Sequence, residues 1–127
     1  MTLSGSLDLW RVLTGALEWC DFDKDQIAVS DMIRSVTPPR AVLLNAPVHN
    51  HPFILAGRRS FMGYAGTLWT HGIVYADRAE ELKRIYEGAP DALDLLKKNH
   101  IDYVVVEPLE KDNVKPLNDA FFEHICA

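Results

Sequence analysis

Side chains suited to binding a polar ligand gather between Gly57 and Gly72. This stretch contains no Asp or Glu, and glycine recurs along it. Glycine inside a helix or strand costs roughly 0.5–1 kcal/mol relative to alanine, so this density predicts a long ordered loop. Such a loop could present its side chains to a polar, anionic or sugar-like ligand. The candidate ligand-binding side chains in it are Arg58, Tyr64, Trp69 and His71.

The two adjacent arginines could pair with a phosphate or a carboxylate. In an extended turn, Arg58 and Arg59 point to opposite sides, so only one of them would face the loop. The alternative is a structural salt bridge to Asp77 or Glu80. Tyr64 and Trp69 could stack on a sugar ring, or they could fill the core beneath the loop.

Three histidines offer a metal-binding alternative. His49 and His51 would share one face of an extended segment, and His71 could join them in a three-histidine zinc site with one open position. The alternative is a set of loop histidines that are hydrogen-bonded near a strand end. Nothing in the spacing requires zinc, so we predict no metal and no cofactor. Cys20 and Cys126 lack zinc-finger spacing, and either a disulfide or two free thiols would fit them.

Two carboxylates follow the most strand-like run of the chain, residues 103–106. Open α/β sheets bind ligands beyond the carboxyl ends of their strands, so Glu107 is a candidate binding residue and Glu110 lies close behind it. The alternative is a structural ion pair with the arginines. No nucleophile elbow or dinucleotide fingerprint is present, and we predict no catalytic residue.

The elements that must position these groups alternate between strand and helix. Residues 41–44 and 103–106 read as buried strands joined through helices, which predicts a parallel pair with a right-handed crossover. The runs 53–56 and 61–62 read as further short strands. Helices are predicted from Asp23 to Val36, over 75–87, after Pro90 and over 117–125. The predicted fold is a small layered α/β domain with a mainly parallel, Rossmann-like sheet.

An N-terminal helix over residues 1–20 precedes the single domain, which is predicted to span residues 21–127. Its apolar residues recur at three- and four-residue steps, which fits a helix docked on the domain. The alternative is the exit from a transmembrane helix, with Trp10 and Trp19 at the membrane interface.

Composition sets further limits. The 127 residues are 48% apolar and carry a net charge of −5, which disfavours nucleic-acid binding. No apolar run reaches the ~20 residues that span a bilayer.

Several phrases along the chain resemble one family. They are Thr37-Pro38-Pro39-Arg40-Ala41-Val42-Leu43, Ala56-Gly57-Arg58-Arg59 with Met62-Gly63-Tyr64, Leu68-Trp69-Thr70-His71-Gly72, Leu95-Leu96-Lys97-Lys98, and Ile101-Asp102-Tyr103-Val104-Val105-Val106-Glu107-Pro108-Leu109-Glu110. The chain resembles the soluble C-terminal extracytoplasmic domain of bacterial multi-spanning membrane proteins of the lipid-phosphate-sugar glycosyltransferase type. It departs from the pattern at Val74, where an acid would be expected.

This resemblance implies a non-catalytic domain on the periplasmic side of the bacterial inner membrane. The family's catalytic carboxylate lies between membrane helices, outside this chain. The implied partners are the membrane portion of the parent chain and a sugar or lipid-phosphate substrate. Two other hypotheses stay open: a self-standing small α/β enzyme with a histidine metal site, and a purely structural or interaction domain.

Overall fold

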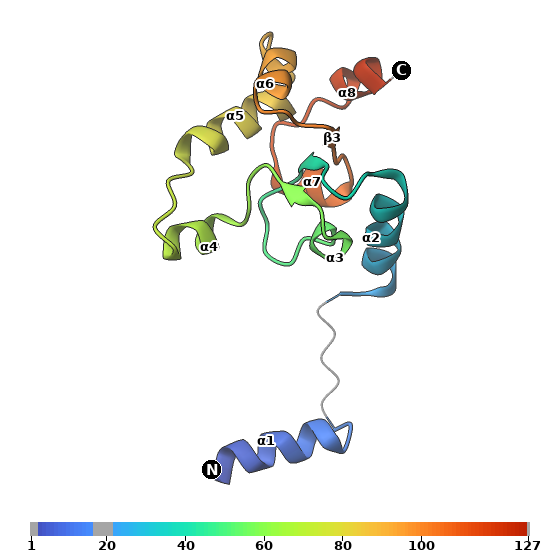
Figure 1. The fold of residues 1–127 in the computed structure, drawn as a ribbon, viewed down its shortest axis with the longest axis vertical. Helices are drawn as coiled ribbons and strands as arrows, with labels where there is room; N and C mark the ends of the chain where they lie inside the picture. The colour runs from blue at the N-terminus through green and yellow to red at the C-terminus, as the bar shows by residue number, and fades with distance from the viewer. Residues whose placement is uncertain (1–2, 17–21, 127) are drawn as a thin grey trace.

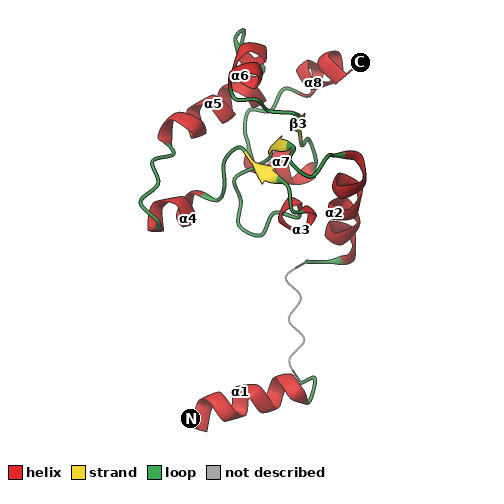
Figure 2. Ribbon diagram, in the orientation of Figure 1, coloured by secondary structure: helices red, strands yellow, loops and turns green. Residues whose placement is uncertain are grey.

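The computed structural model describes residues 3–16 and 22–126 (Figure 1). Most of the described chain is helical, and short strands lie at its centre (Figure 2). The helices are α1 (Leu3–Leu13), α2 (Lys24–Val36), α3 (Phe53–Ala56), α4 (Ala65–Thr70), α5 (Ala76–Tyr86), α6 (Ala92–Lys98), α7 (Pro108–Asn113) and α8 (Asp119–Cys126). The strands are β1 (Val42–Leu44), β2 (Arg59–Ser60) and β3 (Tyr103–Val104).

The described strands form one parallel sheet in the order β2-β1-β3. Leu43 of β1 pairs with Ser60 on one side and with Tyr103 on the other. The predicted parallel pairing of the 41–44 and 103–106 runs is therefore confirmed, and the fold is of the α/β class.

Apolar clusters cover both faces of this sheet, because successive strand residues point to opposite sides. Leu44 packs with side chains from α5, from α8 and from the segments after β2 and α7, among them Ile85, Tyr86 and Phe122. Its neighbour Leu43 packs in a second cluster with Ile33 of α2 and with α3. The continuous apolar run of β1 thus reflects burial on both sides.

The prediction of a strand at residues 53–56 is wrong, because these residues form α3. Phe53 and Ala56 are buried three positions apart, while Ile54 and Leu55 between them are exposed. That spacing follows a helical turn and not the alternation of a strand. A four-residue apolar run is too short for its sequence pattern to separate the two states.

The prediction of one long loop from Gly57 to Gly72 also needs correction, because the segment contains β2 and α4. The predicted strand at residues 61–62 falls instead on Arg59–Ser60, and Phe61 and Met62 are core residues that follow it. Gly57 and Gly72 have φ values of +66° and +67° after α3 and α4. Gly66 lies inside α4, where an added Cβ would come within 2.5 Å of Tyr64 Cε1. The glycines therefore end helices and admit an aromatic ring.

α1 lies apart from the other labelled elements (Figure 1), and its residues from Ser6 onward are exposed. The predicted helix over residues 1–20 is thus helical over Leu3–Leu13. Trp19 and the proposed partner thiol Cys20 lie outside the described residues. Within the described part of the chain, no helix combines the length and apolarity needed to cross a bilayer.

Local capping groups mark the start of α2 and the end of α5. The Asp23 side chain accepts from Gln26 N at 2.8 Å, which completes a capping box at the start of α2. Gly88 follows α5 with φ +67°, and its N–H donates to Ile85 O at 3.0 Å.

Gly88→Ala should destabilise the fold more than Gly57→Ala. Both positions have a left-handed φ, which costs an L-residue about 1–2 kcal/mol. Only at Gly88 would the added Cβ also lie 3.0 Å from Asn118 Nδ2 and Phe121 Cβ, whereas Gly57 has open space. Urea unfolding measures both free energies of unfolding. Equal losses would contradict the predicted packing of α8 against the end of α5.

Candidate functional site

A cavity of about 350 Å³ opens beyond the carboxyl end of β1. Two segments line it: residues 45–54, which run from β1 into α3, and residues 63–68, at the start of α4. Ligands in open parallel α/β sheets bind at this end of the strands. The cavity is thus at the place where the topology favours a binding site.

The cavity combines apolar walls with a few neutral polar groups. Val48, Phe53 and Leu68 supply apolar surface, and Asn50 and Thr67 supply polar side chains. No Lys, Arg, Asp or Glu is among the described residues that line it. An uncharged ligand with both apolar and hydroxyl-bearing faces fits this lining.

An aromatic pair forms one side of the cavity. The rings of His49 and Tyr64 meet edge to face, with centroids 5.4 Å apart and planes at 82°. Tyr64 precedes α4 and is exposed, so its ring is available to a ligand. Gly66 permits this ring position, because any larger residue would place its Cβ against Tyr64.

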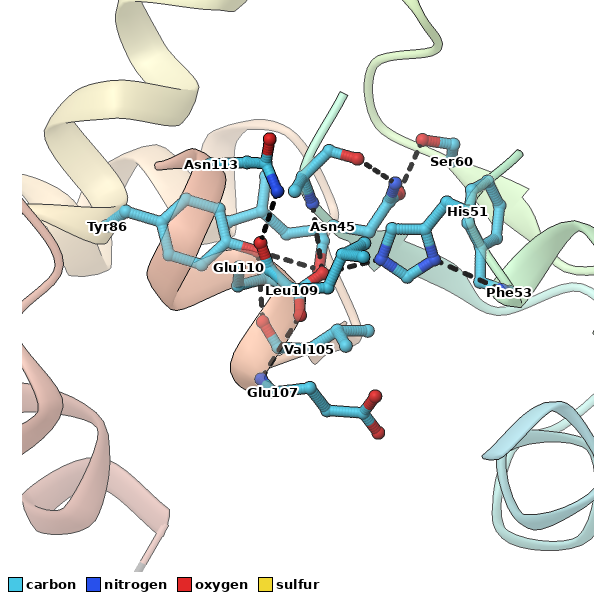
Figure 3. Close-up of polar contacts among 12 residues, drawn as sticks. Asn45, His51, Phe53, Ser60, Tyr86, Val105, Glu107, Leu109, Glu110 and Asn113 are labelled. Atoms are coloured by element: carbon cyan, nitrogen blue, oxygen red, sulfur yellow. Dashed lines mark hydrogen bonds and ion pairs between the residues drawn. The ribbon is translucent and has the colours of Figure 1, made fainter. Parts of the chain in front are cut away.

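A buried histidine–carboxylate pair joins the segment that lines the cavity to α7 (Figure 3). His51 Nε2 lies 2.6 Å from Glu110 Oε1, and their side chains are 1% and 0% exposed. The N–H of Phe53 donates to His51 Nδ1 at 3.1 Å, so this nitrogen has no proton. Nε2 is therefore the ring nitrogen that donates to Glu110.

The Glu110 carboxylate accepts two backbone hydrogen bonds as well. Ala46 N donates to Oε1 at 3.2 Å and Glu107 N donates to Oε2 at 3.1 Å. The bond from Ala46 joins α7 to the segment that lines the cavity, while the bond from Glu107 caps the start of α7. Because neither His51 nor Glu110 lines the cavity, the pair positions its wall and does not contact a ligand.

Tyr86 lies beside this network and fixes the sheet. Its hydroxyl donates to Leu44 O of β1 at 3.3 Å and to Val105 O, just after β3, at 3.0 Å. Burial raises the pKa of the Tyr86 phenol far above its ordinary value, and the negative charge of Glu110 adds to the shift. Tyr86 therefore stays a neutral donor.

Arg58, predicted to bind a ligand, instead serves the end of α2. Its guanidinium donates to Thr37 Oγ1 at 2.9 Å and to the carbonyl oxygens of Thr37, Arg34 and Ala56 at 2.8–2.9 Å. A cation suits the negative end of a helix. The arginine neither lines the cavity nor forms the alternative salt bridge to Asp77 or Glu80.

The other predicted residues also separate in space. Trp69 is exposed on α4 and lines a different hollow with residues 72–76. His71 is exposed, with Nδ1 2.8 Å from Thr67 O. Glu107 lines a third hollow, between α2 and β3. Of the five predicted binding residues, the structure places Tyr64 in the cavity.

The three histidines of the zinc alternative do not come together. His51 is sealed against Glu110, His49 faces Tyr64 and His71 lies at the end of α4. Among the described residues, no group of three His, Cys, Asp or Glu side chains could hold a metal ion.

The sequence pattern did not predict the pairing of His51 with Glu110. The residues are 59 positions apart, and no local spacing connects them. The available signal was their shared position after β1 and β3, whose carboxyl ends meet at one edge of the parallel sheet.

No protein-family model, no curated protein and no solved structure matches this chain.

Glu110→Gln should destabilise the protein by about 1–3 kcal/mol, although it preserves shape. Both carboxylate oxygens accept N–H groups, and the amide NH₂ of glutamine would face one of those donors. The control is Glu123→Gln on the exposed part of α8, which should change little. Urea unfolding of both variants checks this, and similar effects would argue against the buried network.

Glu107→Gln should stabilise the protein near pH 7 and lose this advantage in acid. Burial raises the pKa of Glu107 above its ordinary 4.5, and the charge of Glu110 adds to this. The folded state therefore binds the proton more tightly, and wild-type stability falls as pH rises through the raised pKa. A glutamine at position 107 cannot ionise, so the stability of the variant does not fall in this way. Unfolding at a series of pH values should show the two proteins converging below pH 4.5; a constant difference would contradict the shift.

Proposed function

We propose that this chain is a non-catalytic domain of a membrane glycosyltransferase-like protein, and that its cavity contacts the sugar of the donor or acceptor. The observation that carries the binding role is the cavity at the carboxyl end of β1, with the His49–Tyr64 pair on its side. An aromatic face suits the C–H face of a sugar ring, while Asn50 and Thr67 suit its hydroxyls.

The charges around the cavity favour the sugar over a lipid phosphate. Phosphate recognition generally uses Arg, Lys or a cluster of backbone N–H groups. Arg58, the cation that the sequence offers as a ligand-binding residue, instead donates to carbonyl oxygens at the end of α2. A neutral ring therefore fits the lining better than an anion does.

The chemistry of transfer is assigned to the membrane portion of the parent protein. Two carboxylates follow β3, those of Glu107 and Glu110, and both lie outside the cavity lining. Attachment to a membrane and the extracytoplasmic side rest on the sequence resemblance alone. We also propose a Rossmann-like layering, which the apolar clusters on both faces of β1 support.

A purely structural domain is the second candidate. The networks of Arg58 and Glu110 favour it, because both use charged side chains to satisfy backbone groups. The two candidates differ in what a change in the cavity does: it alters ligand binding in the first and only stability in the second.

Gly66→Ala should separate binding from folding. Alanine is favoured inside a helix by roughly 0.5–1 kcal/mol, but its Cβ would displace the exposed Tyr64 ring. We expect stability within about 1 kcal/mol of wild type and sugar binding weakened about tenfold, the share of one aromatic contact. NMR titration with neutral hexoses, N-acetylhexosamines and uronic acids measures binding.

Gly63→Ala is the matched control. It adds a methyl group to the same cavity, where the closest side-chain atom is Leu68 Cδ2 at 4.0 Å, and leaves Tyr64 in place. An equal loss of sugar binding in both variants would mean that the added methyl group itself blocks the cavity. The position of the Tyr64 ring would then not be the cause. If no sugar binds the wild-type chain, the binding role is wrong and the structural candidate remains.

A further inference from the structure

Two arginines from different elements line one small hollow, which we call the arginine hollow. It has a volume of about 130 Å³. Arg59 comes from β2 and Arg78 from α5, and both are exposed to solvent. The other lining residues are Val42, Ser60, Phe61 and Asn99. No Asp or Glu is among the described residues that line it, so the hollow carries two positive charges and no negative one.

The register of the sheet explains why Arg59 reaches this place. Val42 of β1 pairs with Arg59 of β2, so their side chains point to the same face of the sheet. Val42 packs against the core cluster that contains Leu82 and Ile85 of α5. Arg59 therefore points to the face that α5 covers, whereas Arg58 points to the other face and donates to the end of α2.

Arg78 is held at the hollow by neutral groups. Its Nη1 donates to Phe61 O at 3.2 Å, and its guanidinium carbon lies 5.8 Å from the centre of the Phe61 ring. Among the described residues, neither Arg59 nor Arg78 forms an ion pair. Both guanidinium groups are therefore available to an anion.

Two carboxylates contact residues that line the hollow, and both already have partners. Glu81 Oε1 accepts from Lys98 Nζ at 2.6 Å, and Glu81 Oε2 accepts from Asn99 Nδ2 at 2.7 Å. The bond from Lys98 is the main cause of the lowered pKa of Glu81, and the charge of Arg78 contributes least. Asp102 Oδ2 accepts a backbone N–H at the start of β1, at 2.8 Å. Neither carboxylate lines the hollow.

We propose that the arginine hollow binds a phosphate monoester group. Guanidinium groups donate paired hydrogen bonds to phosphate oxygens, and a phosphate monoester carries about −1.5 to −2 charges at pH 7, which two arginines balance. A carboxylate carries a single charge and would balance one arginine. The hollow is smaller than the roughly 300–1,000 Å³ of pockets that enclose a whole small molecule, so it fits one group of a ligand.

This inference does not rest on sugar binding, because the arginine hollow and the cavity share no lining residue. The phosphate group could belong to inorganic phosphate, to a phosphorylated sugar or to a lipid headgroup, and all three offer the same oxygens to the arginines.

NMR titration of the full chain tests the inference with inorganic phosphate, a hexose phosphate and a short-chain phosphatidic acid below its critical micelle concentration. We expect saturable shifts of the backbone amides of residues 59–61 and 78 with at least one of these compounds. The compound that binds most tightly identifies the source of the phosphate group. Acetate at the same ionic strength should bind at least about tenfold more weakly, because it offers one charge to two arginines.

Arg59→Gln should weaken phosphate binding about tenfold or more, because it removes charge-assisted hydrogen bonds. The matched control is Arg11→Gln, which removes the same charge from an exposed residue of α1. Melting temperatures check that both variants fold.

Three results would overturn the inference: no saturable binding of any of the three phosphate compounds, acetate binding as tight as phosphate binding, or an equal loss in Arg59→Gln and Arg11→Gln. None of these results bears on the binding of neutral sugars in the cavity, which the Gly66→Ala comparison tests separately.

Discussion

The buried carboxylate of Glu110 is the constraint on which the cavity depends. A carboxylate taken out of water is costly unless donors replace its hydration. Here the donors come from Ala46 after β1, Glu107 after β3 and His51 before α3. Because these groups must converge on one carboxylate, the segments that follow two strands are held at fixed positions. Residues 45–54, which form one wall of the cavity, are thereby held in place.

Arg58 does the corresponding work at the other end of the sheet. Its guanidinium satisfies carbonyl oxygens at the end of α2 and so fixes the approach of β2. Arg58 and His51 are candidate ligands for an anion and a metal in the sequence. In the structure, Arg58 instead donates to backbone carbonyls, and His51 accepts from Phe53 N. What remains at the carboxyl end of β1 carries no Lys, Arg, Asp or Glu among the described lining residues, which is why we propose a sugar and not a phosphate as its ligand.

Elements whose signals are local could be predicted from sequence. β1 and β3 are continuous apolar runs, and Asp23 and Gly88 carry capping chemistry within a few residues of the helix ends. α3 could not be predicted, since four apolar residues fit a strand or a helical turn equally well. The roles of Gly66 and of the His51–Glu110 pair could not be predicted either. The first depends on where the Tyr64 ring lies, and the second joins residues 59 positions apart.

The sequence predicts a single site over the acid-free segment from Gly57 to Gly72. In the structure, α4 divides the side chains of this segment between the cavity and a separate hollow. Leu68 and Trp69 are neighbours on α4, where successive residues are rotated by about 100°. Leu68 therefore faces the cavity while Trp69 lines the separate hollow with Val74. A short helix thus lets one stretch of sequence line the cavity and present an exposed tryptophan elsewhere.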